Sequence, residues 1–165
     1  MQVGIIADTH DNVEAIEDAV AIFEAESVDT VVHCGDFIAP PVLPFFEGLE
    51  LHGVLGNNDG EVEGLEAGFA DLAGSELHGR FADLTFEDSR FAVLHGEDRE
   101  DVEGYAESGE YDFVCYGHHH EREQREVGET TVINPGAQFP TVPSEHRTVA
   151  VVDTETEEVR FERIG

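Results

Sequence analysis

The chain has 165 residues, 40% of them hydrophobic, which is the size of one globular domain with its own core, so we expect a single domain over residues 1–165. Its 38 acidic residues face only 8 basic ones, all of them arginine, and the formal net charge is −30. No stretch approaches the roughly 18 consecutive apolar residues of a membrane span, and the N-terminus lacks the features of a secretory signal, so we expect a cytoplasmic protein with no membrane partner.

Five apolar runs, each followed by polar residues, predict buried strands, because strands covered on both faces lose the alternating pattern. In chain order they are VGIIADTH (3–10), DTVVHCGD (29–36), HGVLGNND (52–59), RFAVLHGE (90–97) and FVCYGHHH (113–120). After the first run, Asp11 with Glu14 predicts a helix N-terminus, and apolar residues at helical spacing from Val13 to Phe23 predict the helix itself.

The remaining segments predict a mixed architecture. Prolines limit residues 40–44 to a short helix, and residues 63–74 predict another. Residues 76–94 and 148–164 alternate between apolar and polar around turn residues, which predicts antiparallel hairpins. The fold class expected is therefore a layered α/β domain with mixed β-sheets, helices outside and strand ends gathered at one edge. Cys34 and Cys115 lie inside apolar runs, so we expect buried free thiols in a reducing compartment.

The polar tails of the five runs hold most of the residues that could bind a metal ion. They are Asp8, His10, Asp36, Asn57, Asn58, Asp59, His95, His118, His119 and His120. In open α/β sheets, ligands bind beyond the carboxyl ends of strands. Carboxylate, imidazole and amide groups together suit Mn, Fe, Co, Ni or Zn better than Ca or Mg. Residues two apart in an extended chain share one side, so His118 and His120 are expected to converge while His119 points away.

The number of candidate ligands favours two ions over one. Seven of these side chains are first candidates, namely Asp8, His10, Asp36, Asn57, His95, His118 and His120. A tetrahedral ion takes about four ligands, whereas two ions that share one aspartate use the whole set.

Asp-x-His, Gly-Asp, Gly-Asn-x-Asp, His-Gly and Gly-His-x-His occur in this order between Asp8 and His120, and they resemble the motifs of the calcineurin-like metallophosphoesterases. The later INPGA segment (Ile133 to Ala137) is similar to the Asn-Pro-Gly segment of that family. The short length resembles the small archaeal and bacterial phosphodiesterases within it. The resemblance implies two packed β-sheets flanked by helices, and hydrolysis of small phosphodiesters by a hydroxide that bridges two divalent ions, with manganese expected first and nickel, cobalt, iron or zinc as alternatives.

Carried over residue by residue, the resemblance implies a role for each of the candidates. One ion would be held by Asp8, His10, Asp36 and His120, and the other by Asp36, Asn57, His95 and His118, so that Asp36 bridges the two. The residues expected to act in catalysis are Asp36, Asn57, His95, Asn58 and Asp59.

Asn58 departs from the commoner family pattern. Many members carry a histidine at this position, thought to protonate the leaving oxygen, and asparagine cannot supply that proton at neutral pH. The change therefore favours substrates with good leaving groups. Asp59 is expected to orient the loop or a ligand through hydrogen bonds.

Other functions and partners stay open at this point. The same fold carries a non-catalytic binding scaffold, the retromer subunit, and a phosphomonoesterase or nuclease is a further alternative. The acidic surface argues against nucleic acid as a partner, although high salt would screen the repulsion. The acidic, lysine-free composition resembles that of proteins from salt-loving cells. A homo-oligomer is possible. His33 is expected to be structural, and His52, His78 and His146 are expected on the surface without a role.

Overall fold

A computed structural model describes all 165 residues, and it consists of two mixed β-sheets packed face to face. The six-stranded sheet has the order β11-β10-β1-β2-β3-β4 and the five-stranded sheet the order β5-β6-β7-β9-β8. Strands β1 to β4 run parallel, as do β6, β7 and β9, while the remaining neighbours are antiparallel. This is the α/β architecture expected above.

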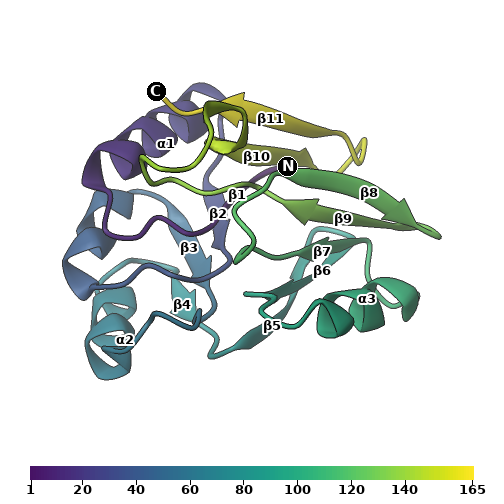
Figure 1. Ribbon diagram of the computed structural model, residues 1–165, viewed down its shortest axis with the longest axis horizontal. Coiled ribbons are helices and arrows are strands. Elements are labelled where there is room, and N and C mark those ends of the chain that lie inside the picture. Colours follow the sequence, from purple (N-terminus) through teal and green to yellow (C-terminus); the bar gives the residue numbers. More distant parts are fainter.

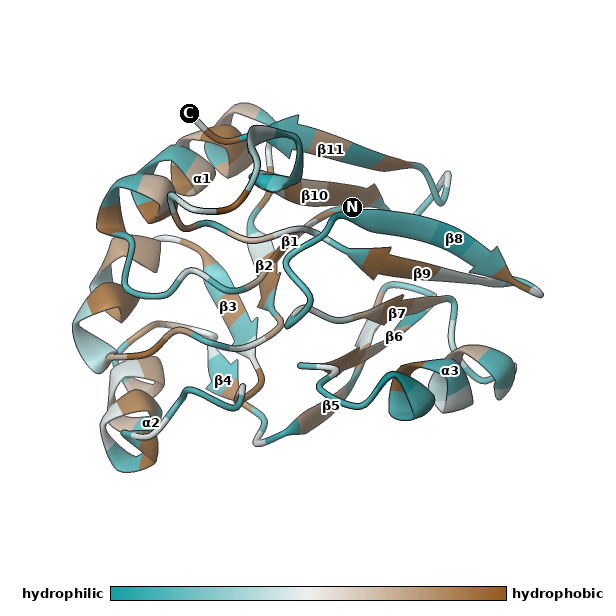
Figure 2. Cartoon of the chain, in the orientation of Figure 1, coloured by the Kyte–Doolittle hydropathy of each residue, from teal (hydrophilic) through white to brown (hydrophobic).

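The strand bounds match the apolar runs closely. The six-stranded sheet comprises β1 (Gln2–Ile6), β2 (Thr30–His33), β3 (Glu50–Gly53), β4 (Glu76–Leu77), β10 (Thr148–Asp153) and β11 (Val159–Arg163). The five-stranded sheet comprises β5 (Phe81–Phe86), β6 (Ser89–Leu94), β7 (Phe113–Cys115), β8 (Glu123–Val127) and β9 (Thr130–Asn134). Figure 2 shows hydrophobic strands in the middle of the molecule, with the hydrophilic strand β8 at its edge.

Helices cover the outer face of each sheet. Helices α1 (Val13–Ala25) and α2 (Val62–Ala70) lie on the side of the six-stranded sheet, and α3 (Arg99–Glu107) lies on the side of the five-stranded one (Figure 1). The three prolines of residues 40–44 give a 3₁₀ helix, η1 (Pro40–Phe46), which agrees with the short helix expected there. A second 3₁₀ helix, η2, covers Ser144–His146.

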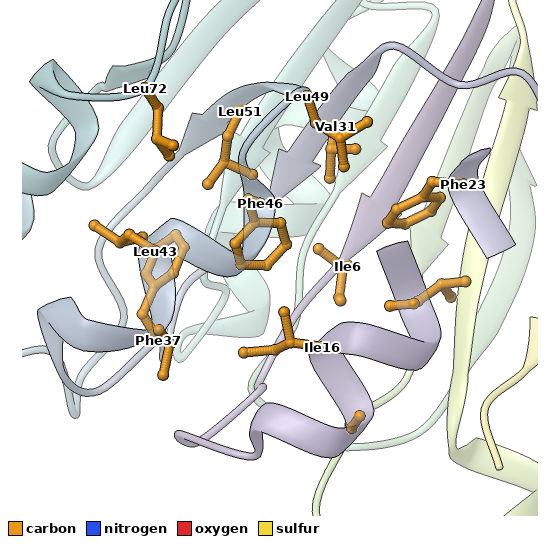
Figure 3. Close-up of a cluster of buried hydrophobic side chains, with 14 of the residues drawn as sticks. Ile6, Ile16, Phe23, Val31, Phe37, Leu43, Phe46, Leu49, Leu51 and Leu72 are labelled. Carbon is orange, nitrogen blue, oxygen red and sulfur yellow. The ribbon is translucent and has the colours of Figure 1, made fainter. Parts of the chain in front are cut away.

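The core has separate layers because the central strands are buried on both faces. Ile6 of β1 faces the helices, where it meets Ile16, Phe23 and Phe46 (Figure 3). Val3 and Ile5 of the same strand face the other sheet and pack in the cluster that contains Phe91 and Phe113. Complete burial of one such side chain contributes about 1.5–3 kcal/mol, so the apolar runs are explained by two-sided burial.

No helix of the chain is at once long enough and apolar enough to cross a bilayer.

Several local expectations were wrong or incomplete. Residues 76–94 form only one antiparallel hairpin, β5–β6, because β4 pairs in parallel with β3 at the edge of the other sheet. The N-cap of α1 is Asn12, whose side chain accepts from the Ala15 N–H, because Asp11 is engaged elsewhere and accepts from the Ala39 N–H. Helix α3 and the β8–β9 hairpin were not predicted. Only Val102 and Ala106 of α3 are buried, which leaves a weak apolar pattern.

Candidate metal centre

The loops that follow β1, β2, β3, β6 and β7 meet where the two sheets adjoin. Asp8 and His10 follow β1, Asp36 follows β2, and Asn57 follows β3, all in the six-stranded sheet. His95 directly follows β6, and the His118–His120 segment follows β7, both in the five-stranded sheet. The cluster is therefore assembled from both sheets.

On one side of the cluster, two histidines face the carboxylate of Asp8. The Nε2 atoms of His10 and His120 lie 3.6 Å and 3.5 Å from Asp8 Oδ1. His10 Nε2 is also 3.3 Å from Asp36 Oδ2. One ligand atom from each of Asp8, His10 and His120 lies within 4.8 Å of the other two, which is close enough for a shared ion.

On the other side, His95 and His118 complete the set. His95 Nε2 lies 3.5 Å from Asp36 Oδ2 and 3.8 Å from Asp8 Oδ1. His118 Nδ1 lies 3.3 Å from His95 Nε2 and 3.1 Å from Asn57 Oδ1. All seven first candidates are thus connected to one another through close contacts.

Several atoms of the cluster fit a cation better than they fit one another. Asp8 Oδ1 and His10 Nε2 are buried and make no hydrogen bond, although buried polar atoms are normally paired. His95 Nδ1 lies 2.7 Å from the Cys34 carbonyl oxygen, so this nitrogen carries a proton and donates it, which leaves Nε2 facing the two aspartates as the nitrogen that could bind a cation. Carboxylate oxygens and imidazole nitrogens that are buried together in this way are suitable ligands for a divalent cation.

The charges of the cluster perturb its pKa values in opposite directions. The carboxylates of Asp36 and then Asp8 raise the pKa of His10 to about 9. Burial alone would raise the pKa of Asp36, but the contacts with His10 and His95 hold it far below its usual range. Burial lowers the pKa of His118, which favours its neutral form. Burial lowers the pKa of His95, but the carboxylates of Asp36 and Asp8 outweigh burial and raise it. Without a cation, protonated His10 therefore supplies positive charge beside the two carboxylates, and the carboxylates also favour the protonated form of His95.

Backbone geometry explains how so many polar groups converge. The spacing of Asp8 with His10, and of His118 with His120, predicts that each pair lies on one side of an extended segment, but the backbone there is not extended. All four residues and Asp36 have positive φ, between 45° and 65°. Such conformations are uncommon outside glycine and cluster at functional sites. The convergence therefore comes from tight left-handed turns.

Two glycines leave room for the buried carboxylates. A Cβ atom on Gly56 would lie 2.1 Å from Asp36 Oδ1, and one on Gly117 would lie 2.6 Å from Asp8 Oδ2. Real Cβ atoms do not approach oxygen this closely, so both positions require glycine for close approach.

Asn58 and Asp59 hold Asp36 in place through hydrogen bonds. Asn58 donates to Asp36 twice, from its backbone N–H to Oδ1 (3.0 Å) and from Nδ2 to Oδ2 (2.8 Å). The Asp59 carboxylate accepts from the backbone N–H groups of Asp36, Ile38 and Gly56, each at 2.8 Å. Asp59 thus joins the loops after β2 and β3, as expected of a residue that orients them.

Phe139 is a neighbour of the cluster that the sequence did not reveal. Its ring centroid lies 4.6 Å from that of His10 and 4.7 Å from that of His120. It follows the INPGA segment by two residues, and this position is the only signal that could have indicated it. In the same segment, Asn134 donates to the carbonyl of Gly117 (3.1 Å) and supports the histidine loop.

The other histidines lie outside the cluster. The ring of His119 contacts the Gly96 carbonyl (2.9 Å), in line with a bystander role. His33 is buried, contacts Thr9 and stacks on Phe37, so it is structural as expected. His52 and His78, expected on the surface, are instead largely buried, with side chains only 12% and 16% exposed, because β3 and β4 bring them together.

Comparisons with known proteins show the family and the fold of the chain. Residues 1–157 match the model of the calcineurin-like phosphoesterase superfamily domain. The phosphodiesterase MJ0936 of Methanocaldococcus jannaschii is 38% identical, with 97% of each chain covered. A solved structure of an archaeal phosphodiesterase superposes with a TM-score of 0.91 at 38% identity, over 99% of this chain and 100% of that one. A Vps29 mutant from Entamoeba histolytica, with a TM-score of 0.68 and 19% identity over 99% and 98% of the two chains, shares the fold alone. The chain therefore belongs to the calcineurin-like phosphoesterase superfamily.

Proposed function

We propose that the chain is a metal-dependent phosphodiesterase that holds two divalent cations. Both would bind in the strand-end cluster, which consists of the seven side chains of Asp8, His10, Asp36, Asn57, His95, His118 and His120. The observation that carries this proposal is the convergence of seven carboxylate, imidazole and amide side chains, two of whose buried atoms make no hydrogen bond. The phosphodiesterase MJ0936, at 38% identity, gives independent support for the substrate class.

The proposed ligand sets follow from which side chains face one another. Asp8, His10, Asp36 and His120 would hold one cation, and Asp36, Asn57, His95 and His118 the other. Shared use of Asp36 is supported by its Oδ2 atom, which lies 3.3 Å from His10 Nε2 and 3.5 Å from His95 Nε2. A mixed oxygen and nitrogen set favours a first-row divalent ion, and we expect manganese first.

When bound, two divalent cations activate water for attack on phosphorus and neutralise the charge that develops on the phosphoryl oxygens. The chain's own residues position the reacting groups. Asn58 donates to both oxygens of Asp36 and holds its carboxylate in one orientation. The Cys34 carbonyl fixes the tautomer of His95. Such contacts behind the ligands typically change metal affinity or activity by about 10–100-fold.

The preference for a leaving group follows from Asn58. It stands where many members of the family carry a histidine, and an amide cannot protonate the leaving oxygen. We therefore expect faster turnover of aryl and other activated phosphodiesters than of alkyl esters. A binding scaffold would not need this complete set of ligands, so the enzyme is favoured over that alternative.

The acidic surface bears on where the protein works. The net charge is −30, so the acidic side chains repel one another at low ionic strength. At about 1 M salt the screening length falls to roughly 3 Å and the repulsion weakens. We infer a salt-rich cytoplasm as the working environment.

The decisive experiment measures turnover of an activated aryl phosphodiester in high salt by the metal-stripped protein, before and after manganese is restored. Asp36→Asn and His95→Ala are expected to lower turnover by at least about 100-fold, since each removes a proposed ligand. His146→Ala is the matched control, because His146 contacts Glu145 and the Arg122 N–H and no residue of the cluster. Circular dichroism checks that the fold is retained. Near wild-type turnover in either ligand variant would refute the proposed centre.

A further inference from the structure

A second group of metal-binding side chains lies on neighbouring strands of the six-stranded sheet. His52 of β3 and Glu76 of β4 are partners across the parallel pair. His78 follows two residues later, and its backbone N–H donates to the Gly53 carbonyl (2.9 Å), which continues the pairing. One ligand atom from each of these side chains lies within 4.8 Å of the other two. β4 is an edge strand of only two residues (Figure 1).

The two imidazoles face each other as two ligands of one ion would. His52 Nδ1 lies 3.0 Å from His78 Nε2. Two nitrogens that each bind zinc at about 2.0–2.1 Å in a tetrahedral site lie roughly 3.3 Å apart, so a small movement of either ring admits the ion. In the ion-free protein, one of the two nitrogens must carry a proton for the other to accept.

The imidazole of His52 is also held in a suitable orientation from behind. Its other nitrogen, Nε2, lies 2.7 Å from Glu50 Oε1. A carboxylate in this place keeps the proton on Nε2 and leaves the Nδ1 lone pair free, and metal-binding histidines usually have such a partner. The Phe86 ring packs against His52 at 5.7 Å between centroids, so the orientation is fixed on this side too.

We propose that His52, Glu76 and His78 bind a divalent transition-metal ion that ties the short edge strand β4 to β3. Two imidazoles and one carboxylate suit zinc, cobalt, nickel or copper, and do not suit calcium or magnesium. An ion that binds only the folded chain raises its stability, so the role of this site is structural. It shares no residue with the strand-end cluster.

Zinc stoichiometry tests this proposal. The metal-stripped full chain and its His78→Ala variant are dialysed against the same micromolar free zinc and analysed for bound metal. The wild type is expected to hold one zinc ion more per chain than the variant. Zinc is also expected to raise the melting temperature of the wild type by more than that of the variant. His146→Ala, the control, should match the wild type. Because the strand-end cluster contributes equally to all three proteins, the difference does not depend on how many ions that cluster holds.

A second measurement uses the unaltered protein and so does not depend on the variant folding. Crystals soaked in zinc should give an anomalous scattering peak between His52 Nδ1 and His78 Nε2. No peak there, or equal zinc content in wild type and His78→Ala, would overturn the proposal. Turnover of the aryl phosphodiester should be the same in His78→Ala and wild type, which separates this site from the proposed catalytic centre.

Discussion

The Asp59 carboxylate is expected to be worth several kcal/mol to the stability of the folded chain. It is 5% exposed and accepts three backbone hydrogen bonds, from Asp36, Ile38 and Gly56. In Asp59→Ala, three N–H groups lose their acceptor. A buried donor left without a partner costs about 1–3 kcal/mol. Water that enters the vacated space would satisfy part of this need, and we expect a loss of about 3–5 kcal/mol in the free energy of unfolding.

The expected loss per hydrogen bond is in the lower half of the range of about 1–3 kcal/mol, because the carboxylate is itself costly to bury. Burial raises the pKa of Asp59 in spite of its three donors, so the gain from those bonds is partly offset. Asp59→Asn keeps one oxygen, which can still accept from Asp36 and Gly56, while its NH₂ group faces the Ile38 N–H. We therefore expect a smaller loss of about 1–3 kcal/mol for the amide.

Denaturant unfolding of the metal-free protein at one fixed salt concentration measures both losses. Asp18→Ala is the control, because Asp18 is exposed in the middle of α1 and its removal changes the charge by the same amount. Its effect should stay within about 0.5 kcal/mol. A loss below about 1 kcal/mol in Asp59→Ala would refute the reasoning, since it would mean that the three donors find other partners at no cost.

Four further outcomes follow from the charges and the side-chain chemistry of the molecule. The raised pKa of His10, about 9, means that His10 is protonated at neutral pH when no cation is bound, so cation binding should release its proton. Titration calorimetry in buffers of different ionisation enthalpy measures this release, which should be smaller in His10→Ala; equal release in the two proteins would contradict the expectation. Because the pKa of His10 is raised in the metal-free fold, its protonated form stabilises that fold fully below the unfolded pKa of about 6.5, and this contribution is lost as the pH rises through about 9. The free energy of unfolding should therefore depend less on pH in His10→Ala than in the wild type, and identical pH profiles of the two proteins would contradict this. Asn58→His should speed hydrolysis of alkyl esters relative to aryl esters by about tenfold or more, because an imidazole can donate a proton to the leaving oxygen; an unchanged ratio would argue against a role for this position. The melting temperature should rise with potassium chloride up to molar concentrations because the net charge is −30, and a flat curve would contradict the salt-rich interpretation.

Much of the fold could be read from the sequence where local pattern and burial agree. The central strands are covered on both faces, so their apolar runs are continuous and were recognised without knowledge of their partners. The edges of the fold gave weaker signals. Strand β8 (EQREV) has no fully buried residue, and α3 buries only Val102 and Ala106, so neither has an apolar pattern strong enough to distinguish it from a loop.

The candidate site divides in the same way. The order of residues alone brought seven side chains into one hypothesis, because parallel strands end at a common edge and the motifs resemble a family. The means by which they converge could not be seen. Asp and His tolerate a left-handed backbone better than most residues other than glycine, but they adopt it too rarely for the residue types to predict it at Asp8, Asp36 and His120. The surrounding loops select it there.

By itself, the sequence determined the chemistry: which groups can bind a cation, the acidic surface, and the absence of a proton donor at Asn58. Only the tertiary structure decided which distant groups meet. His52 and His78 are 26 residues apart and carry no motif, yet the register between β3 and β4 places their nitrogens 3.0 Å from each other. Contacts of this kind depend on how strands align across a sheet, and that alignment is set by the packing of the whole core.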